Sequence, residues 1–195
     1  MLGMSNDPSN PVSAWSRVKS ERGPDLIVFR SRFDRMTHPL SGEEMDRLVL
    51  ECGDWVNVVA LTSERRLVVV RQYRFGSADV TTEVPGGMID PGEGHEESAK
   101  RELLEETGYS STKWTYLGSV DPNPAVQTNR MHHWLAEDCE LQAEQDLDPG
   151  EDIEVATLSE DELRQAIATG EIRHALVLTA LHRVYDLREE LRSSE

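Results

Sequence analysis

A loop and a helix in the middle of the chain, residues 87–109, constrain its fold more than any other segment. Residues 95–107 have the pattern of a helix, with glycines before them, two glutamates in the first turn and Gly108 as a C-terminal stop. At about 100° per residue, four charged side chains fall within an arc of roughly 140°. They are Arg101, Glu102, Glu105 and Glu106. The segment therefore predicts a helix with one core face and one face of three carboxylates beside a guanidinium.

Extended segments and helices alternate in the rest of the chain. The strand patterns lie at residues 25–30, 55–62, 66–73, 81–84, 115–120, 131–136 and 153–158. The helical patterns that close the chain lie at residues 159–168 and 173–192, and Ser159 followed by Glu162 predicts a capping box. Residues 63–65 are typical of a hairpin loop, and residues 32–52 resemble a hairpin arm or turn region. This mixed order favours an α/β sandwich around a mixed sheet.

The length of the chain, 195 residues, allows one core or one core with a small appended layer. We expect a flexible polar tail over residues 1–22, a small β-rich layer over residues 23–52 and the main domain over residues 53–195.

The composition excludes several classes of function. A formal charge of −17 argues against a nucleic-acid partner, because phosphate backbones are bound by clustered Lys and Arg. The longest apolar run is far shorter than the roughly 20 residues that span a bilayer, and the N-terminus has no signal-peptide pattern. Cys52 and Cys139 lie far apart without CxxC spacing and are expected to be reduced thiols, which favours a cytoplasmic protein. His132 and His133 would point to opposite faces of a strand, so we expect neither a metal pair nor a catalytic role there.

The carboxylate face of the helix indicates a particular chemistry. Hard oxygen ligands on one face suit Mg²⁺, with Mn²⁺ as a substitute, together with phosphate oxygens of a substrate. Such ions neutralise and orient a pyrophosphate and activate a water for in-line attack on phosphorus. Arg101 is expected to hold a glutamate through a forked pair of hydrogen bonds. The alternative is a solvated acidic face, which is what most charge runs are.

The full spacing of the segment carries a resemblance. The order is Gly87, five residues, Glu93, seven residues, then Arg101-Glu102-Leu103, one residue, Glu105-Glu106, one residue, and Gly108-Tyr109. This order resembles a complete Nudix box, and only Tyr109 departs from it, where an aliphatic residue is more usual. The resemblance implies a Nudix-type α/β/α sandwich and a hydrolase of nucleoside diphosphates linked to a further moiety.

The resemblance also implies roles for residues of the box. It implies four metal ligands, namely the carboxylates of Glu102, Glu105 and Glu106 and the carbonyl of Gly86. Glu93 and Arg101 would support the helix and its loop. Arg101 and Glu105 are also expected to be catalytic, together with a carboxylate from a later loop.

Beyond the box, the chain resembles the ADP-ribose pyrophosphatase branch of the family. The segments that carry this resemblance are Val70–Arg74, Glu83–Gly87, Pro124 and Asp148–Ile153. They imply that Arg74, Glu83 and Arg71 bind substrate, although Arg71 and Arg74 would lie on opposite faces of a strand and Glu83 could simply pair with a neighbouring arginine. They imply Glu151 as the catalytic base. Three nearby carboxylates remain alternatives for that role, those of Asp148, Asp152 and Glu154.

The implied reaction splits ADP-ribose into AMP and ribose 5-phosphate, with a small-molecule substrate and no membrane or nucleic-acid partner. The alternatives are another nucleotide sugar, NADH, a dinucleoside polyphosphate, or a ligand sensor without turnover. The resemblance further implies a homodimer, with residues 23–52 as the dimerisation element.

Overall fold

The computed structural model describes residues 13–187, which divide into two compact units. The first unit contains the residues up to Cys52 and residues 123–129. The second contains residues 53–122 and the chain from Arg130 onwards. The two units are described separately below.

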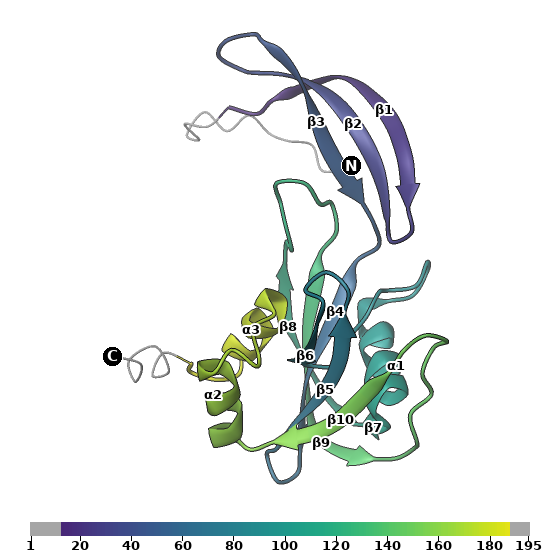
Figure 1. The fold of residues 1–195 in the computed structure, drawn as a ribbon, viewed down its shortest axis with the longest axis vertical. Coiled ribbons are helices and arrows are strands. Elements are labelled where there is room, and N and C mark those ends of the chain that lie inside the picture. The colour runs from purple at the N-terminus through teal and green to yellow at the C-terminus, as the bar shows by residue number, and fades with distance from the viewer. Residues whose placement is uncertain (1–12, 188–195) are drawn as a thin grey trace. The chain divides into compact units, whose positions relative to one another are not determined.

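The first unit is a three-stranded antiparallel sheet of β1 (Ser16–Leu26), β2 (Phe29–Thr37) and β3 (Glu44–Glu51), in that order (Figure 1). Residues 123–129 join it, since the Leu50 amide donates to the Val126 carbonyl at 2.7 Å and the Thr128 amide donates to the Leu50 carbonyl at 3.1 Å.

Two expectations for this region are wrong. Residues 16–22, expected in a tail, lie in β1, where main-chain pairing with β2 holds them although their side chains are exposed. The single strand expected at residues 25–30 is instead the end of β1 and the start of β2, joined by a turn at residues 27–28. The chain reverses at Ile27, which has a φ of 50° and is fully exposed. Residues 1–12 of the expected tail lie outside the described residues.

The second unit is built around a seven-stranded mixed sheet, in which β4 and β9 are parallel and the other pairs are antiparallel. Its strands are β4 (Trp55–Thr62), β5 (Leu67–Arg74), β6 (Asp79–Glu83), β7 (Tyr109–Ser110), β8 (Lys113–Val120), β9 (Met131–Leu141) and β10 (Ile153–Leu158). The order is β10-β5-β4-β9-β7, with β6 also paired to β5 and β8 to β9. Each strand expected in this unit is present, with ends shifted by a few residues at most sites.

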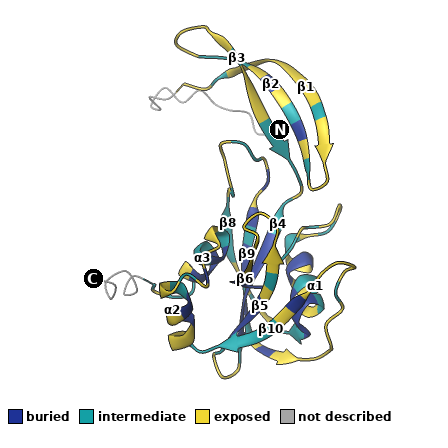
Figure 2. Ribbon diagram, in the orientation of Figure 1, coloured by how far each residue is buried: buried dark blue, intermediate teal, exposed yellow. Residues whose placement is uncertain are grey.

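Helices cover both faces of this sheet (Figure 1). Helix α1 (His95–Thr107) packs Ala99 and Leu103 against alternate residues of β4 and β5. Helices α2 (Glu160–Ala168) and α3 (Ala175–His182) pack against the other residues of the same strands. Because β4 and the first half of β5 are almost entirely apolar on both faces, residues 56–61 and 67–70 are buried, whereas residues 71–74 are mostly exposed (Figure 2). The expected α/β/α sandwich around a mixed sheet is confirmed.

The sequence pattern predicted the start of α2 correctly but not the end of α3. The capping box at Ser159 is present, since its side chain accepts from the Glu162 amide and Glu162 bonds back to the Ser159 amide. The expected helix at residues 173–192 is too long, because α3 ends at His182 and the amides of Arg183 and Val184 bond to carbonyls three residues back. Residues 188–192 of that prediction lie outside the described residues. Among residues 13–187, no helix has the length and apolarity needed to cross a membrane.

Candidate active site

The loop before α1 is fixed along β4, and this arrangement sets the direction of Gly86. The Val58 amide donates to the Pro85 carbonyl at 2.8 Å, and the Val56 amide donates to the Gly87 carbonyl at 2.9 Å. Because neighbouring peptide groups in an extended segment point to opposite sides, the Gly86 amide turns away from β4. It donates to Oε2 of Glu106 at 2.9 Å. The loop and the acidic face of α1 are thereby joined directly.

Both glycines of this loop stand where a side chain would clash. A Cβ at Gly86 would collide with the Val56 carbonyl oxygen, which belongs to the backbone of β4. A Cβ at Gly87 would collide with the carboxylate of Glu102. Glycine therefore allows the backbone to approach β4 at one position and leaves room for a carboxylate at the next.

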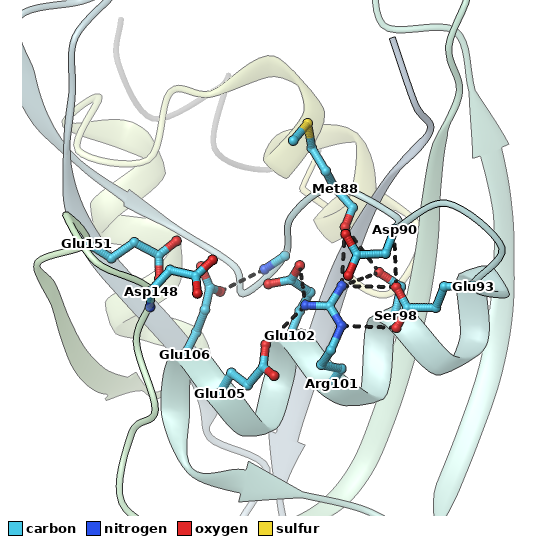
Figure 3. Close-up of polar contacts among 11 residues, drawn as sticks. Met88, Asp90, Glu93, Ser98, Arg101, Glu102, Glu105, Glu106, Asp148 and Glu151 are labelled. Carbon is cyan, nitrogen blue, oxygen red and sulfur yellow. Dashed lines mark hydrogen bonds and ion pairs between the residues drawn. The ribbon is translucent and has the colours of Figure 1, made fainter. Parts of the chain in front are cut away.

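Arg101 is the centre of the polar contacts on α1 (Figure 3). Its Nε and Nη2 donate to the two carboxylate oxygens of Glu93 at 2.9 and 3.0 Å, which is the expected forked pair. Its Nη1 donates to Glu102 and to Glu105, each at 3.0 Å. The hydrogen bonds to Glu93 raise the pKa of Arg101 and lower that of Glu93. One guanidinium thus ties the loop carboxylate to two carboxylates of the helix.

The carboxylates on α1 differ in exposure and in proton affinity. Glu106 is only 5% exposed, and burial raises its pKa to about 8, with further contributions from Glu102 and Glu151. Burial also raises the pKa of Glu102 to about 7, although the nearby Arg101 lowers it. These shifts arise because several negative groups converge in a partly buried space without a matching number of positive charges.

The late acidic loop brings Glu151 to this cluster. Figure 3 shows Glu151 and Asp148 beside Glu106, and the charge of Glu151 contributes to the raised pKa of both Glu102 and Glu106. The Asp148 amide donates to the Glu151 carboxylate at 3.0 Å. Of the alternatives for the base, Asp148 lies beside Glu151, whereas Glu154 forms an exposed ion pair with Arg71.

Sequence reasoning missed the residue that holds this loop in place. The Gln145 side chain donates to the carbonyls of Glu106 at 2.7 Å and Ile153 at 3.0 Å. In addition, the Asp146 amide donates to the Glu105 carbonyl at 2.9 Å. Residues 142–152 follow no strand or helix pattern, so the sequence offered no periodic signal that could single out Gln145.

Arg74 and Glu83 form an ion pair with each other. Two parallel hydrogen bonds of 2.8 Å run from Nε and Nη2 of Arg74 to Glu83, which also accepts from the Thr81 hydroxyl at 2.6 Å. Burial alone would raise the pKa of Glu83, but these hydrogen bonds outweigh it and the pKa is lowered. The hydrogen bonds to Glu83 raise the pKa of Arg74, and the charges of Glu106 and Glu151 raise it further.

Arg71 is not part of this arrangement. It lies an odd number of residues from Arg74 on β5, so its side chain leaves the opposite face of the sheet. There it forms an exposed ion pair of 3.4 Å with Glu154, its neighbour on β10. The structure therefore brings Arg74, Glu83, Gly86, the three glutamates of α1 and Glu151 together and leaves Arg71 apart.

The chemistry of the donor set fits a divalent cation. Its members are carboxylate and carbonyl oxygens, which are the ligands that hard cations prefer, and Gly87 keeps the space beside Glu102 free of a side chain. Within residues 13–187, no three His, Cys, Asp or Glu side chains already stand close enough to enclose an ion. The reason is visible in the contacts, because Arg101 holds Glu102 and Glu105 on one side while Gly86 holds Glu106 on the other. A cation would compete with these bonds for the same oxygens.

The chain is similar to known proteins over most of its length. The family model of the NUDIX domain matches residues 54–181. The chain is 28% identical to an ADP-ribose pyrophosphatase of Bacillus subtilis (strain 168) over 80% of this chain and 84% of the relative. It is 29% identical to a methanol dehydrogenase activator of Bacillus methanolicus over 77% of this chain and 81% of the relative.

A solved structure shares the fold. It is described as an ADP compounds hydrolase, and it aligns with a TM-score of 0.79 at 21% identity over 94% of this chain and 97% of its own. Because the family model covers more than half of the residues and includes the whole acidic site, the chain belongs to the NUDIX domain family.

Proposed function

We propose that this protein is a pyrophosphohydrolase that depends on a divalent metal ion and splits ADP-ribose into AMP and ribose 5-phosphate. The observation that carries the proposal is the convergence of Glu102, Glu105, Glu106 and Glu151 (Figure 3), with the Gly86 amide bonded to Glu106. The hydrogen bonds to Glu83 raise the pKa of Arg74, and the charges of Glu106 and Glu151 raise it further. The names of the relatives support the choice of substrate, since one is an ADP-ribose pyrophosphatase and one an ADP compounds hydrolase.

The metal would be Mg²⁺, with Mn²⁺ as a substitute, held by the carboxylates of Glu102, Glu105 and Glu106 and by the Gly86 carbonyl. When bound, it offsets the charge of the diphosphate and acidifies water. Arg101 keeps two of these carboxylates in place through its hydrogen bonds to Glu102 and Glu105.

The protein's own groups perform the remaining steps. Glu151 accepts a proton from the attacking water, whose oxygen forms a bond to one phosphorus while the bridging P–O bond breaks. Arg74 binds the diphosphate, and Glu83 fixes the orientation of the Arg74 guanidinium through its two hydrogen bonds. The proton taken up by Glu151 then passes to solvent or to the leaving phosphate.

A substrate panel with purified protein and about 5 mM Mg²⁺ tests this function, a concentration suited to sites that bind the ion weakly. The panel holds ADP-ribose, UDP- and GDP-sugars, NADH, a diadenosine polyphosphate and dATP, and phosphate is read after a phosphatase step. We expect ADP-ribose to be preferred and EDTA to abolish turnover. Preference for another member of the panel would overturn ADP-ribose as the substrate but would leave the proposed type of reaction unchanged. If no member of the panel is hydrolysed although metal is bound, the ligand sensor without turnover would be favoured.

We further propose that the protein is a homodimer in which a second copy covers the sheet of residues 16–51. That sheet carries exposed apolar side chains, among them Val18, Phe33 and Leu48, and Phe33 and Leu48 are neighbours across β2 and β3. A groove of about 480 Å³ on the same sheet is lined by Val18 and Phe33 and otherwise by charged side chains, those of Lys19, Glu21, Arg35, Glu44 and Asp46. Apolar groups that gather on one surface mark an interface.

Sedimentation equilibrium tests the dimer. Wild-type protein is expected to have twice the chain mass, and Phe33→Glu is expected to have the mass of one chain. A wild-type mass of one chain at micromolar concentration would overturn the dimer and leave the proposed reaction untouched.

A further inference from the structure

The first residue of α1, His95, is enclosed by aromatic rings from two neighbouring strands. Its ring stacks on that of His132 with centroids 4.5 Å apart and planes 8° from parallel, and on that of Tyr116 at 4.9 Å and 25°. The ring of Trp134 lies 5.4 Å away on the same strand as His132. Helix α1, which carries the acidic face, therefore begins with the His95 ring packed against β8 and β9.

The contact with Trp134 fixes the proton state of His95. The indole Nε1–H of Trp134 donates to Nδ1 of His95 at 3.2 Å. Since an indole N–H can only donate, Nδ1 must carry a lone pair, and the imidazole is neutral in this arrangement. A proton added at Nδ1 would remove the acceptor and break the bond.

His132, the stacking partner, is itself held at both ring nitrogens. Its Nδ1 lies 2.9 Å from the Tyr116 hydroxyl, and its Nε2 lies 3.3 Å from the Asp54 carboxylate. Asp54 also accepts from the Arg130 amide through the other carboxylate oxygen, at 2.7 Å. The carbonyl of Asp54 accepts from the Ile89 amide at 2.9 Å. The network thus continues from the aromatic rings into the loop that precedes α1.

Both ends of that loop are consequently attached to the same cluster. Ile89 is held near its start through Asp54, and His95 is held at its end through Trp134 and the stack. Between them, Glu93 forms the forked pair with Arg101, which in turn holds the carboxylates of the helix. A shift of either end would move Glu93 and with it Arg101.

We propose that His95 is a positioning residue whose neutral ring anchors the loop and first turn of α1, and whose protonation releases that anchor. The effect on turnover rests on the proposed function, whereas the anchor itself does not. A positive charge on His95 would break the bond from Trp134.

The groups around His95 decide when this release occurs. Asp54 on the segment before β4 and Glu96 on α1 attract a proton to His95, whereas burial and the charge of His132 on β9 oppose it. Tyr116 on β8 faces the ring as a hydroxyl bonded to His132. Burial is the largest of these effects, and the pKa of His95 lies below its ordinary value. The anchor is therefore formed at neutral pH and is lost as the solution becomes acidic.

The first test uses the metal-free protein and needs no substrate. Histidine ring resonances and the Trp134 indole N–H resonance are followed by NMR from pH 7.5 to 4.5, with Trp134→Phe to assign the indole. We expect His95 to titrate below about 6.5, the ordinary value, and the indole resonance to shift with the same midpoint. An indole resonance that stays constant while His95 titrates would overturn the anchor, as would a neutral His95 whose Nδ1 carries the proton.

The second test separates the ring from its acceptor nitrogen. His95→Phe keeps a ring to stack but cannot accept from Trp134, whereas His95→Gln supplies an acceptor without a ring. We expect His95→Phe to lose about tenfold in kcat at pH 7.5 with little change in KM, because small misplacements of catalytic groups have effects of that size. His95→Gln is expected to recover part of the loss. Both variants are expected to lose the part of the acidic limb that follows the titration of His95, while the part due to the carboxylates of the site remains.

The control is His182→Gln, which removes an exposed histidine from the end of α3. It is expected to leave kcat and its pH profile unchanged. Mn²⁺ affinity measured by electron paramagnetic resonance gives a readout without turnover, and we expect weaker binding in His95→Phe. Wild-type Mn²⁺ affinity and an unchanged acidic limb in His95→Phe would refute the positioning role even if no substrate of the panel were hydrolysed.

Discussion

At the scale of single residues, the two adjacent glycines before α1 show how position decides the effect of one methyl group. A Cβ at Gly86 meets the backbone of β4, which cannot move without disturbing the sheet. A Cβ at Gly87 meets the end of a flexible side chain, the Glu102 carboxylate. The first clash would destabilise the fold, whereas the second would displace the Glu102 carboxylate in the site.

The prediction is that Gly86→Ala and Gly87→Ala fail in different ways. Gly86→Ala is expected to lower the free energy of unfolding by about 2 kcal/mol, the usual size of an overpacking effect. Gly87→Ala is expected to stay within about 1 kcal/mol of wild type and to lose roughly a hundredfold in kcat, because Glu102 is displaced. Urea unfolding and steady-state kinetics measure the two effects. Equal stability losses in both variants would contradict this assignment.

A second prediction at this scale concerns the two arginines of β5. Arg74→Ala is expected to raise KM at least tenfold and to destabilise the fold by about 3 kcal/mol, since it leaves the buried Glu83 unpaired. Adding Glu83→Gln is expected to restore most of the stability but not KM. Arg71→Ala removes an exposed pair with Glu154, so KM should stay unchanged and stability should change by less than about 1 kcal/mol. A larger KM effect at Arg71 than at Arg74 would refute the placement.

The sequence predicted some of these residues for sound physical reasons. The acidic face of α1 follows from helix geometry alone, and the opposite faces of Arg71 and Arg74 follow from strand geometry. The partner of Arg101 could not be derived in this way, because Glu93 lies in a loop whose path depends on hydrogen bonds to β4 and to Asp54 before it. The same limit applies to Gln145, whose two acceptors come from α1 and β10.

At the scale of elements, the sequence predictions were wrong where no turn-forming or helix-stopping residue marks the end of a strand or helix. The turn at residues 27–28 contains Ile and Val, whereas two-residue hairpin loops usually carry Gly, Asn or Asp. An apolar run of four residues, 26–29, therefore gave a strand pattern where the chain reverses. Helix α3 ends at His182 without a Gly or Pro after it, so its pattern continued in the sequence beyond its end. The strands of the second sheet were predictable because their apolar runs are bounded by turn residues.

The interior of strand β9 leads to a prediction about pH. His133 is fully buried, and both ring nitrogens lack a hydrogen-bond partner among the described residues. Burial lowers its pKa to about 4, and the charges of Arg183 and His132 contribute. Between pH 6.5 and 4 the unfolded chain binds a proton at this position that the folded chain does not bind. The stability from this group is complete above pH 6.5 and is lost as the pH falls towards 4.

The expected loss over that range is about 3 kcal/mol, from a pKa difference of roughly two and a half units. Urea unfolding at several pH values measures it in wild type and in His133→Leu, and His182→Gln serves as the matched control. The slope of stability against pH should become shallower in His133→Leu and stay unchanged in the control. An unchanged slope in His133→Leu would show that His133 does not titrate differently in the two states.

At the scale of the whole molecule, the site belongs to one of the two units. Every residue assigned to metal, substrate or base lies in the part of the chain from Gly53 onwards, excluding residues 123–129. The three-stranded sheet of residues 16–51 contributes none of them and instead presents apolar side chains. The sequence predicted a small β-rich layer at the N-terminus but not the contribution of residues 123–129, because hydrogen bonds between distant segments leave no periodic signal.

The proposed reaction requires the carboxylates of α1 to be the site of hydrolysis. The most direct measurement is the rate at which AMP and ribose 5-phosphate form from ADP-ribose and Mg²⁺ in wild type, Glu102→Gln, Glu106→Gln and Glu96→Gln. Glu96 lies on the same helix but pairs with Lys100 on the exposed side. We predict losses of at least about a hundredfold in kcat for Glu102→Gln and Glu106→Gln and a wild-type rate for Glu96→Gln, since metal and charge effects of this kind have such magnitudes. Near-full activity in a folded Glu102→Gln or Glu106→Gln variant would show that hydrolysis does not depend on the carboxylates of α1.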